Sequence, residues 1–258
     1  MAGEPIFTKR RAGAPRGLFA WEAAGLGWLA EATAEGGAAV VEVLDFDEHH
    51  LSEPELVPGL ATVEAAEDFG RALARTHLFG APGFGAAPTG WQGDGFIGDA
   101  LLPMPSAPMP RWGEFYANFR VLPFARRAFD AGSLDAASLD AVERACARLV
   151  DGDFDDDRPA ARIHGDLWAG NLQFTRDGAV LIDPAAHGGH AETDLAMLDL
   201  FGAPHLRRLG DAWAEAWGAG DGWRERTALH QLHPLLVHAV LFGGGYGAQA
   251  GSAARRLC

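Results

Sequence analysis

Three polar side chains near the middle of the sequence have the types and spacing needed to hold a metal ion beside a base. Asp166 is followed five positions later by Asn171 and twelve after that by Asp183, in the run IHGDLWAGNLQFTRDGAVLID. Residues 171–174 and 179–182 predict two antiparallel strands joined by a short turn, with Phe174 opposite Ala179. That register brings Asn171 and Asp183 together at the open end of the hairpin. Their oxygens are ligands that Mg²⁺ prefers.

This pattern favours phosphoryl transfer. In that chemistry a loop Asp accepts the proton of the acceptor hydroxyl, while a downstream Asn and a strand-end Asp hold metal ions that bridge the phosphates. The sequence therefore predicts Asp166 as the base and Asn171 and Asp183 as metal ligands. The plain alternative is that these residues cap turns and strand ends, although their joint spacing ahead of a hairpin argues against it. A metal-dependent phosphohydrolase would need a denser ligand cluster.

A lone lysine near the N-terminus is the second chemical signal. The chain has 21 Lys and Arg residues, and Lys9 is its only Lys. An ammonium is a compact point charge that a planar guanidinium does not replace in a tight phosphate site. A strand Lys held by a helix Glu is a usual grip on nucleotide phosphates, and Glu22 lies on the next predicted helix. The alternative is an exposed Lys and an unrelated Glu.

The elements that must position these residues follow from hydrophobic periodicity and from glycine and proline. They are a strand at 4–10, a helix at 18–34, short strands within 38–46 and near Leu51, a helix at 63–79, helices over 112–150, a hairpin within 161–184 and helices from Thr193 onward. The Gly- and Pro-rich stretch 80–110 predicts a long irregular loop. We expect a small N-terminal lobe at 1–58 and a mostly helical lobe at 59–258.

Composition limits the classes of function. The net charge of −14 would repel a phosphate backbone, so we expect no nucleic-acid partner, whereas a cationic amine would be attracted. The sequence has no apolar run long enough for a membrane span or a signal peptide, which predicts a cytoplasmic protein without a membrane partner. Cys146 and Cys258 form no disulfide framework and no metal-ligand cluster.

Several histidines invite a metal interpretation that the sequence does not support. His187 and His190 lie with Glu192 and Asp194 in a Gly-rich turn, and a second group of histidines near helical spacing, at 230, 233 and 238, includes a prolyl neighbour. Packed or solvated histidines are the expectation for both groups. The acidic run at 153–157 is expected to be a solvated loop.

The run HGDLWAGN at 164–171, with LIDPAAHGGHAETDLAMLDLFG at 181–202, closely resembles the fructosamine kinase family, whose relatives include aminoglycoside and choline kinases. Matching runs cover most of the chain: FTK at 7–9, FAWEAAGL at 19–26, FGRALARTH at 69–77, GDGFIG at 93–98 and HQLHPLLVHAVLFGGGY at 230–246. The resemblance implies an α+β, two-lobed, protein-kinase-like fold with a β-containing N-terminal lobe and a mostly helical C-terminal lobe.

The resemblance also implies an ATP- and Mg²⁺-dependent kinase. Its substrate would be a sugar hydroxyl in a ketoamine, a fructosamine or ribulosamine adduct of a small molecule or a protein, and the reaction would lead to deglycation. Lys9 would bind the phosphates with Glu22 as its partner, while Asp166, Asn171 and Asp183 would keep the roles given above.

Three more residues take roles from the resemblance. His164 and Asp194 would support the catalytic loop, and Asp194 also suits the first turn of a helix. Trp168, beside the base, either faces a sugar ring or fills the core.

One departure from the family concerns the N-terminus. Eight residues precede Lys9, too few for the strands and glycine-bearing turn that the family places over the nucleotide. We therefore expect a shortened N-terminal lobe, from a late start or from a shortened branch. The alternatives within the same fold are an aminoglycoside- or choline-like kinase, and a catalytically weak pseudokinase that acts as a binding module.

Overall fold

A computed structural model describes residues 5–258. The strands are β1 (Ile6–Arg10), β2 (Ala39–Val40), β3 (Asp45–Phe46), β4 (His50–Pro54), β5 (Gly95–Ile97), β6 (Ala100–Leu102), β7 (Ala161–Ile163), β8 (Leu172–Thr175), β9 (Gly178–Leu181) and β10 (His187–Gly189). The α-helices are α1 (Leu18–Ala30), α2 (Val63–Phe79), α3 (Trp112–Phe115), α4 (Leu122–Asp130), α5 (Ala136–Asp151), α6 (Glu192–Phe201), α7 (Leu206–Trp217), α8 (Thr227–His230), α9 (Leu232–Phe242) and α10 (Tyr246–Arg255). Further helical turns are Thr33–Glu35, Tyr116–Val121, Ala169–Asn171 and Trp223–Arg226.

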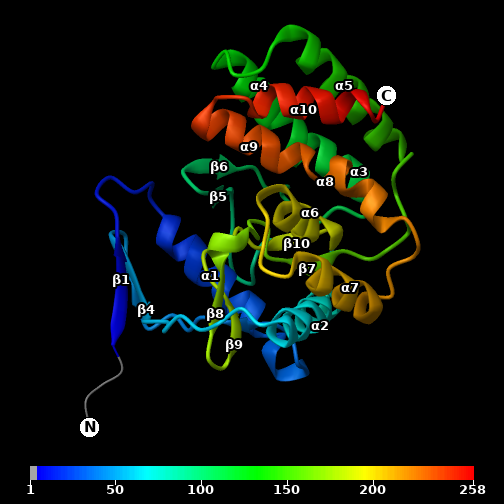
Figure 1. Cartoon of the computed structure of the whole chain (residues 1–258). Helices are drawn as coiled ribbons and strands as arrows, with labels where there is room; N and C mark the ends of the chain where they lie inside the picture. Colours follow the sequence, from blue (N-terminus) through cyan, green and yellow to red (C-terminus); the bar gives the residue numbers. More distant parts are fainter. Residues whose placement is uncertain (1–4) are drawn as a thin grey trace.

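The N-terminal strands form a small antiparallel sheet in the order β1-β4-β3, in which Lys9 pairs with Leu51. It projects from one side of the molecule, and α1 lies between it and the remaining elements (Figure 1). The predicted strand at 4–10 is present from Ile6, and Glu4 lies outside the described residues.

The helices of the C-terminal part enclose the hydrophobic core. α4, α5, α9 and α10 gather at the end of the molecule away from the small sheet, while α2 packs against α7 (Figure 1). The prediction for α2 is confirmed to the residue because both ends carry start and stop signals. The Thr62 hydroxyl accepts a hydrogen bond from the Ala65 N–H, and Gly80 ends the helix.

A second sheet connects the N-terminal part of the chain to the predicted hairpin. β8 and β9 pair in antiparallel register with Phe174 opposite Ala179, as predicted, and β2 adds to β9 in parallel. Asn171 ends a 3₁₀ turn and β8 begins one residue later, so the strand starts later than expected.

The stretch 80–110 is less irregular than predicted, because it contains the antiparallel pair β5–β6. The tight turn there uses Gly98 with φ of 51°, a conformation that glycine adopts without strain. Among residues 5–258, no helix has both the length and the apolar character needed to cross a bilayer.

Candidate active site

The predicted hairpin places Asn171 at the centre of a hydrogen-bond cluster. The Ile182 N–H donates to the Asn171 carbonyl at 3.1 Å, which continues the strand register by one pair. The Asn171 amide nitrogen donates to the Asp166 carbonyl at 2.8 Å, to the Asp166 carboxylate at 3.3 Å and to the Asp183 carbonyl at 3.2 Å. Since these contacts use Nδ2, the amide oxygen remains for a cation.

Asp166 has the electrostatics of a proton acceptor that works near neutral pH. Burial disfavours its charged form, and the negative charge of Asp183 adds to that effect. The hydrogen bond from Asn171 opposes them, and together they raise the pKa of Asp166 to about 7. A general base is most effective when its pKa lies near the working pH.

Lys9 lies between two carboxylates. Its ammonium donates to Glu22 Oε1 at 2.6 Å and also contacts Asp183 Oδ1. Burial alone would lower the pKa of Lys9, but the two carboxylates outweigh it and raise that pKa, so the ammonium stays charged. Two carboxylates around one ammonium leave net negative charge, which suits a further cation.

The backbone of Asp183 is strained. Its φ is 54°, in the left-handed region that residues with a side chain seldom adopt. The carbonyl contact from Asn171 and the carboxylate contact with Lys9 hold it there. Backbone strain of this kind persists where surrounding contacts fix it, and it clusters at functional sites.

The catalytic-loop region is held from behind by a buried carboxylate. Asp194, on the first turn of α6, accepts hydrogen bonds from the backbone N–H groups of His164 at 2.8 Å and Gly165 at 3.0 Å. His164 in turn accepts from the Asp166 N–H at 3.2 Å, and its Nε2–H donates to the Ile182 carbonyl at 2.9 Å. This chain of contacts links α6 to the hairpin through the residues just before Asp166.

His77 extends this support and was missed by the sequence analysis. Its Nε2 lies 3.1 Å from Asp194 Oδ2, while its Nδ1 accepts a hydrogen bond from the Trp213 indole at 2.9 Å. The Trp213 contact fixes the tautomer in which Nε2 carries the proton and donates to Asp194. The signal in the sequence was a histidine in the last turn of a well-predicted helix, but nothing there indicated its partner.

The predicted residues line one cavity of about 380 Å³ between the small sheet and the hairpin. Lys9, Glu22, Asp166, Asn171 and Asp183 all contribute to it. Trp168 does so too and is 43% exposed, so its ring does not fill the core. His164 and Asp194 are buried and outside this lining.

The family assignment rests on a match over nearly the whole chain. The family described as fructosamine kinase matches residues 2–258. This chain belongs to the fructosamine kinase family.

Individual relatives agree with the family assignment. A Thermobifida fusca crystal structure assigned as a fructosamine-3-kinase is 46% identical with a TM-score of 0.89, covering 99% of this chain and 86% of that one. A Thermus thermophilus protein named a probable ketoamine kinase is 32% identical over 90% of this chain and 79% of its own length. A Synechocystis protein of the same name is 36% identical over 70% of this chain, and the match spans 58% of its length.

The predicted fold class is confirmed by more distant structures. An aminoglycoside phosphotransferase, solved with ADP and hygromycin B, superposes with a TM-score of 0.58 at 14% identity, covering 92% of this chain and 82% of that chain. At this identity the likeness concerns the fold alone. This fructosamine kinase family member therefore has the mixed α and β, protein-kinase-like architecture expected from its sequence.

A second buried carboxylate in this family member, Glu53 on β4, was also missed. Its Oε2 has no hydrogen-bond partner among residues 5–258. Burial raises the pKa of Glu53 from 4.5 to about 7, helped by the negative charges of Asp183 and Glu22 and opposed by Lys9. The folded protein therefore holds a proton on Glu53 that the unfolded chain releases at lower pH.

We predict that Glu53→Gln removes part of the pH dependence of stability. A raised folded-state pKa contributes stability that is complete below pH 4.5 and is lost as the pH rises through about 7. The wild-type free energy of unfolding should therefore fall between pH 5 and pH 8 by more than that of the variant, by on the order of 2 kcal/mol. Urea unfolding of both proteins at both pH values measures this difference, and parallel curves would contradict it.

Proposed function

We propose that this protein transfers the γ-phosphoryl group of ATP to a sugar hydroxyl of a ketoamine, a fructosamine or ribulosamine adduct. The observation that carries the proposal is the meeting of Asp166, Asn171, Asp183 and Lys9 in one cavity, in a chain of the fructosamine kinase family. The names of the Thermus and Synechocystis relatives supply the substrate class.

The residues divide the work in the following way. The Asp166 carboxylate accepts the proton of the sugar hydroxyl, and the hydroxyl oxygen forms a bond to the γ-phosphorus of ATP. The bond between that phosphorus and the β,γ-bridging oxygen breaks, which gives a sugar phosphate ester and ADP. Lys9, oriented by Glu22, neutralises phosphate charge. Asn171 and Asp183 would hold Mg²⁺, which would supply charge neutralisation on the phosphates. The donor set fits that ion, since it offers an amide oxygen and a carboxylate.

The remaining predicted residues have supporting roles. Asp194 and His164 keep the backbone before Asp166 in place, and Trp168 offers a flat apolar face to the sugar ring. We assign nucleotide binding to the lobe of residues 1–58 and catalysis to that of residues 59–258. Loss of the phosphorylated sugar from the product would return the free amine, which amounts to deglycation.

The test is a transfer assay on the purified chain with ATP, Mg²⁺ and the fructose adduct of lysine, read by ³¹P NMR as a new sugar phosphate ester. Free lysine and an aminoglycoside are the control acceptors. Ester formation with the ketoamine alone would support the proposal. Transfer to the aminoglycoside alone would overturn the substrate, and no transfer together with no ATP binding would overturn kinase function.

We predict that Lys9→Arg does not preserve activity even though it preserves charge. The ammonium fits between Glu22 and Asp183, where a planar guanidinium is too broad. We expect kcat/KM for ATP to fall by about tenfold or more. Steady-state kinetics measure this, with the converse charge-preserving swap Arg176→Lys in the exposed hairpin turn as the matched control. Equal kinetics in both variants would refute the phosphate role.

A further inference from the structure

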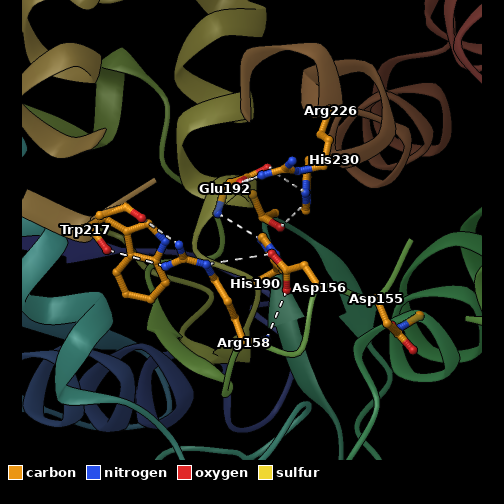
Figure 2. A network of polar contacts seen from close by, with 11 residues as sticks. Asp155, Asp156, Arg158, His190, Glu192, Trp217, Arg226 and His230 are labelled. Carbon is orange, nitrogen blue, oxygen red and sulfur yellow. Dashed lines mark hydrogen bonds and ion pairs between the residues drawn. The ribbon is translucent and has the colours of Figure 1, made fainter. Parts of the chain in front are cut away.

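Three buried side chains outside the active site meet where the start of α6 lies next to the end of α8. His190 precedes α6, Glu192 begins it and His230 ends α8, and none is more than 5% exposed. Figure 2 shows Arg226 and His230 reaching Glu192, with His190 and Asp156 next to it. Each of the three side chains has a ligand atom within 4.8 Å of those of the other two. One histidine from each of the two groups in the sequence therefore contributes, which spacing alone did not indicate.

The distance between His230 Nε2 and Glu192 Oε2 matches the spacing of two ligand atoms on one metal ion. His230 Nε2 lies 3.4 Å from Glu192 Oε2 and has no hydrogen-bond partner among residues 5–258. Metal–ligand bonds of about 2.0–2.2 Å in a tetrahedral zinc site separate neighbouring ligand atoms by about 3.3–3.6 Å. The other nitrogen of His230, Nδ1, lies 3.1 Å from the Thr193 hydroxyl. In the tautomer whose Nδ1–H donates to that hydroxyl, Nε2 carries the lone pair that would bind the ion; in the other tautomer, Nε2–H points toward Glu192.

The surroundings hold these groups in place and keep Glu192 ionised. Arg226 contacts both oxygens of Glu192, using one lone pair of each, so Oε2 keeps a second. Burial opposes ionisation, but the contacts of His230 and Arg226 outweigh it and lower the pKa of Glu192 to about 2. Arg226 is partly exposed, so water screens part of its repulsion toward a second cation.

His190 has the outer partner that metal-bound histidines usually have. Its Nε2 lies 3.2 Å from Asp156 Oδ2, and a carboxylate behind a histidine orients the ring and raises its basicity. Its Nδ1, the nitrogen that would bind the ion, accepts the Glu192 N–H at 3.2 Å, and the ion would replace that contact. The Trp112 ring lies 5.0 Å from the His190 ring and 4.8 Å from the His230 ring, which restricts both.

We propose that His190, Glu192 and His230 form a binding site for one divalent transition-metal ion of the zinc class, separate from the nucleotide site. Two imidazoles and one carboxylate suit Zn²⁺, whereas Mg²⁺ prefers oxygen ligands alone. The ion would tie the start of α6, which carries Asp194, to the end of α8. The site involves neither ATP nor the acceptor, so it stands whether or not the proposed function does.

The experiment is calorimetric titration of the metal-stripped protein with Zn²⁺ in excess Mg²⁺, without nucleotide. The background carries Cys258→Ser and His50→Gln, because an exposed thiol and a partly exposed histidine flanked by carboxylates are themselves zinc ligands. We expect one Zn²⁺ per chain. His230→Phe should weaken binding by at least about a hundredfold, since loss of a group that only orients a ligand already costs about 10- to 100-fold.

A matched control lies one helical turn away. His233 is equally buried with an unpartnered Nε2 among residues 5–258, but it is not in the three-residue group, so His233→Phe should bind Zn²⁺ as the background does. Equal loss in both variants, or no Zn²⁺ binding in the background, would overturn the site. Co²⁺ added to the background protein gives a reading that needs no core variant. Intense visible absorption of a tetrahedral ion supports the site, and the weak spectrum of aqueous Co²⁺ contradicts it.

Discussion

Replacing Asp166 with Asn should lower kcat by a factor of about 10²–10⁴, the range that general base catalysis contributes. The amide keeps the size of the side chain but cannot accept the hydroxyl proton. The Asn171 contacts to the Asp166 carbonyl and to the Asp183 carbonyl do not depend on the carboxylate, so the loop should keep its shape. Lys9 and Glu22 are untouched, and the affinity for ATP should change little.

The measurement is kcat with the ketoamine substrate, together with ATP binding by calorimetry. Asp177→Asn serves as the matched control, since Asp177 lies in the exposed turn of the same hairpin and should tolerate the change. A kcat within about threefold of wild type in Asp166→Asn would remove the base assignment. Loss of ATP binding in that variant would instead assign Asp166 to the nucleotide site.

Replacing Asp194 with Asn should destabilise the fold by about 2–5 kcal/mol, because three donors converge on a carboxylate that is 1% exposed. Burial would raise the pKa of Asp194, but the contacts with His77, His164 and Gly165 outweigh it and lower that pKa, so the group is ionised. An amide can accept through one oxygen only, and its NH₂ group would face a donor. At least one of the buried donors would therefore lose its partner.

Urea unfolding measures this loss of stability. A measurement of kcat at a temperature where the variant is folded shows how far the substitution affects catalysis. We expect kcat to fall with little change in the KM for ATP, since the backbone before Asp166 loses its support. Asp199→Asn, at the exposed end of the same helix, controls for a general effect of removing charge from α6. Coincident unfolding curves for wild type and Asp194→Asn would refute the role of this carboxylate.

The local part of the site could be predicted because short-range rules determine it. Strand alternation and a short turn fix the register of β8 and β9, and the register alone brings Asn171 to Ile182 and hence close to Asp183. The ends of α2 were predictable for the same reason, since a capping Thr and a terminal Gly act within a few residues.

The supports of the site could not be predicted, because they join distant segments. His77 and Asp194 are 117 residues apart, and His77 and Trp213 are 136 apart. Periodicity predicts which face of a helix is buried, but it does not identify the residue opposite. The convergence of His190 and His230 escaped detection for that reason, and the short β5–β6 pair was hidden by its glycines.

The pairing of β2 with β9 also constrains how the molecule can flex. The Val41 N–H donates to the Leu181 carbonyl at 3.0 Å, and the Gly59 N–H donates to the Phe174 carbonyl at 2.7 Å. The segment before β3 and the segment after β4 are therefore both hydrogen-bonded to the catalytic hairpin. A hinge between these segments and the hairpin would break those bonds. We therefore expect the active-site cavity to open by a movement of β1, β3 and β4 alone. The distance between the Lys9 ammonium and the Asp183 carboxylate would increase in that movement and would report it.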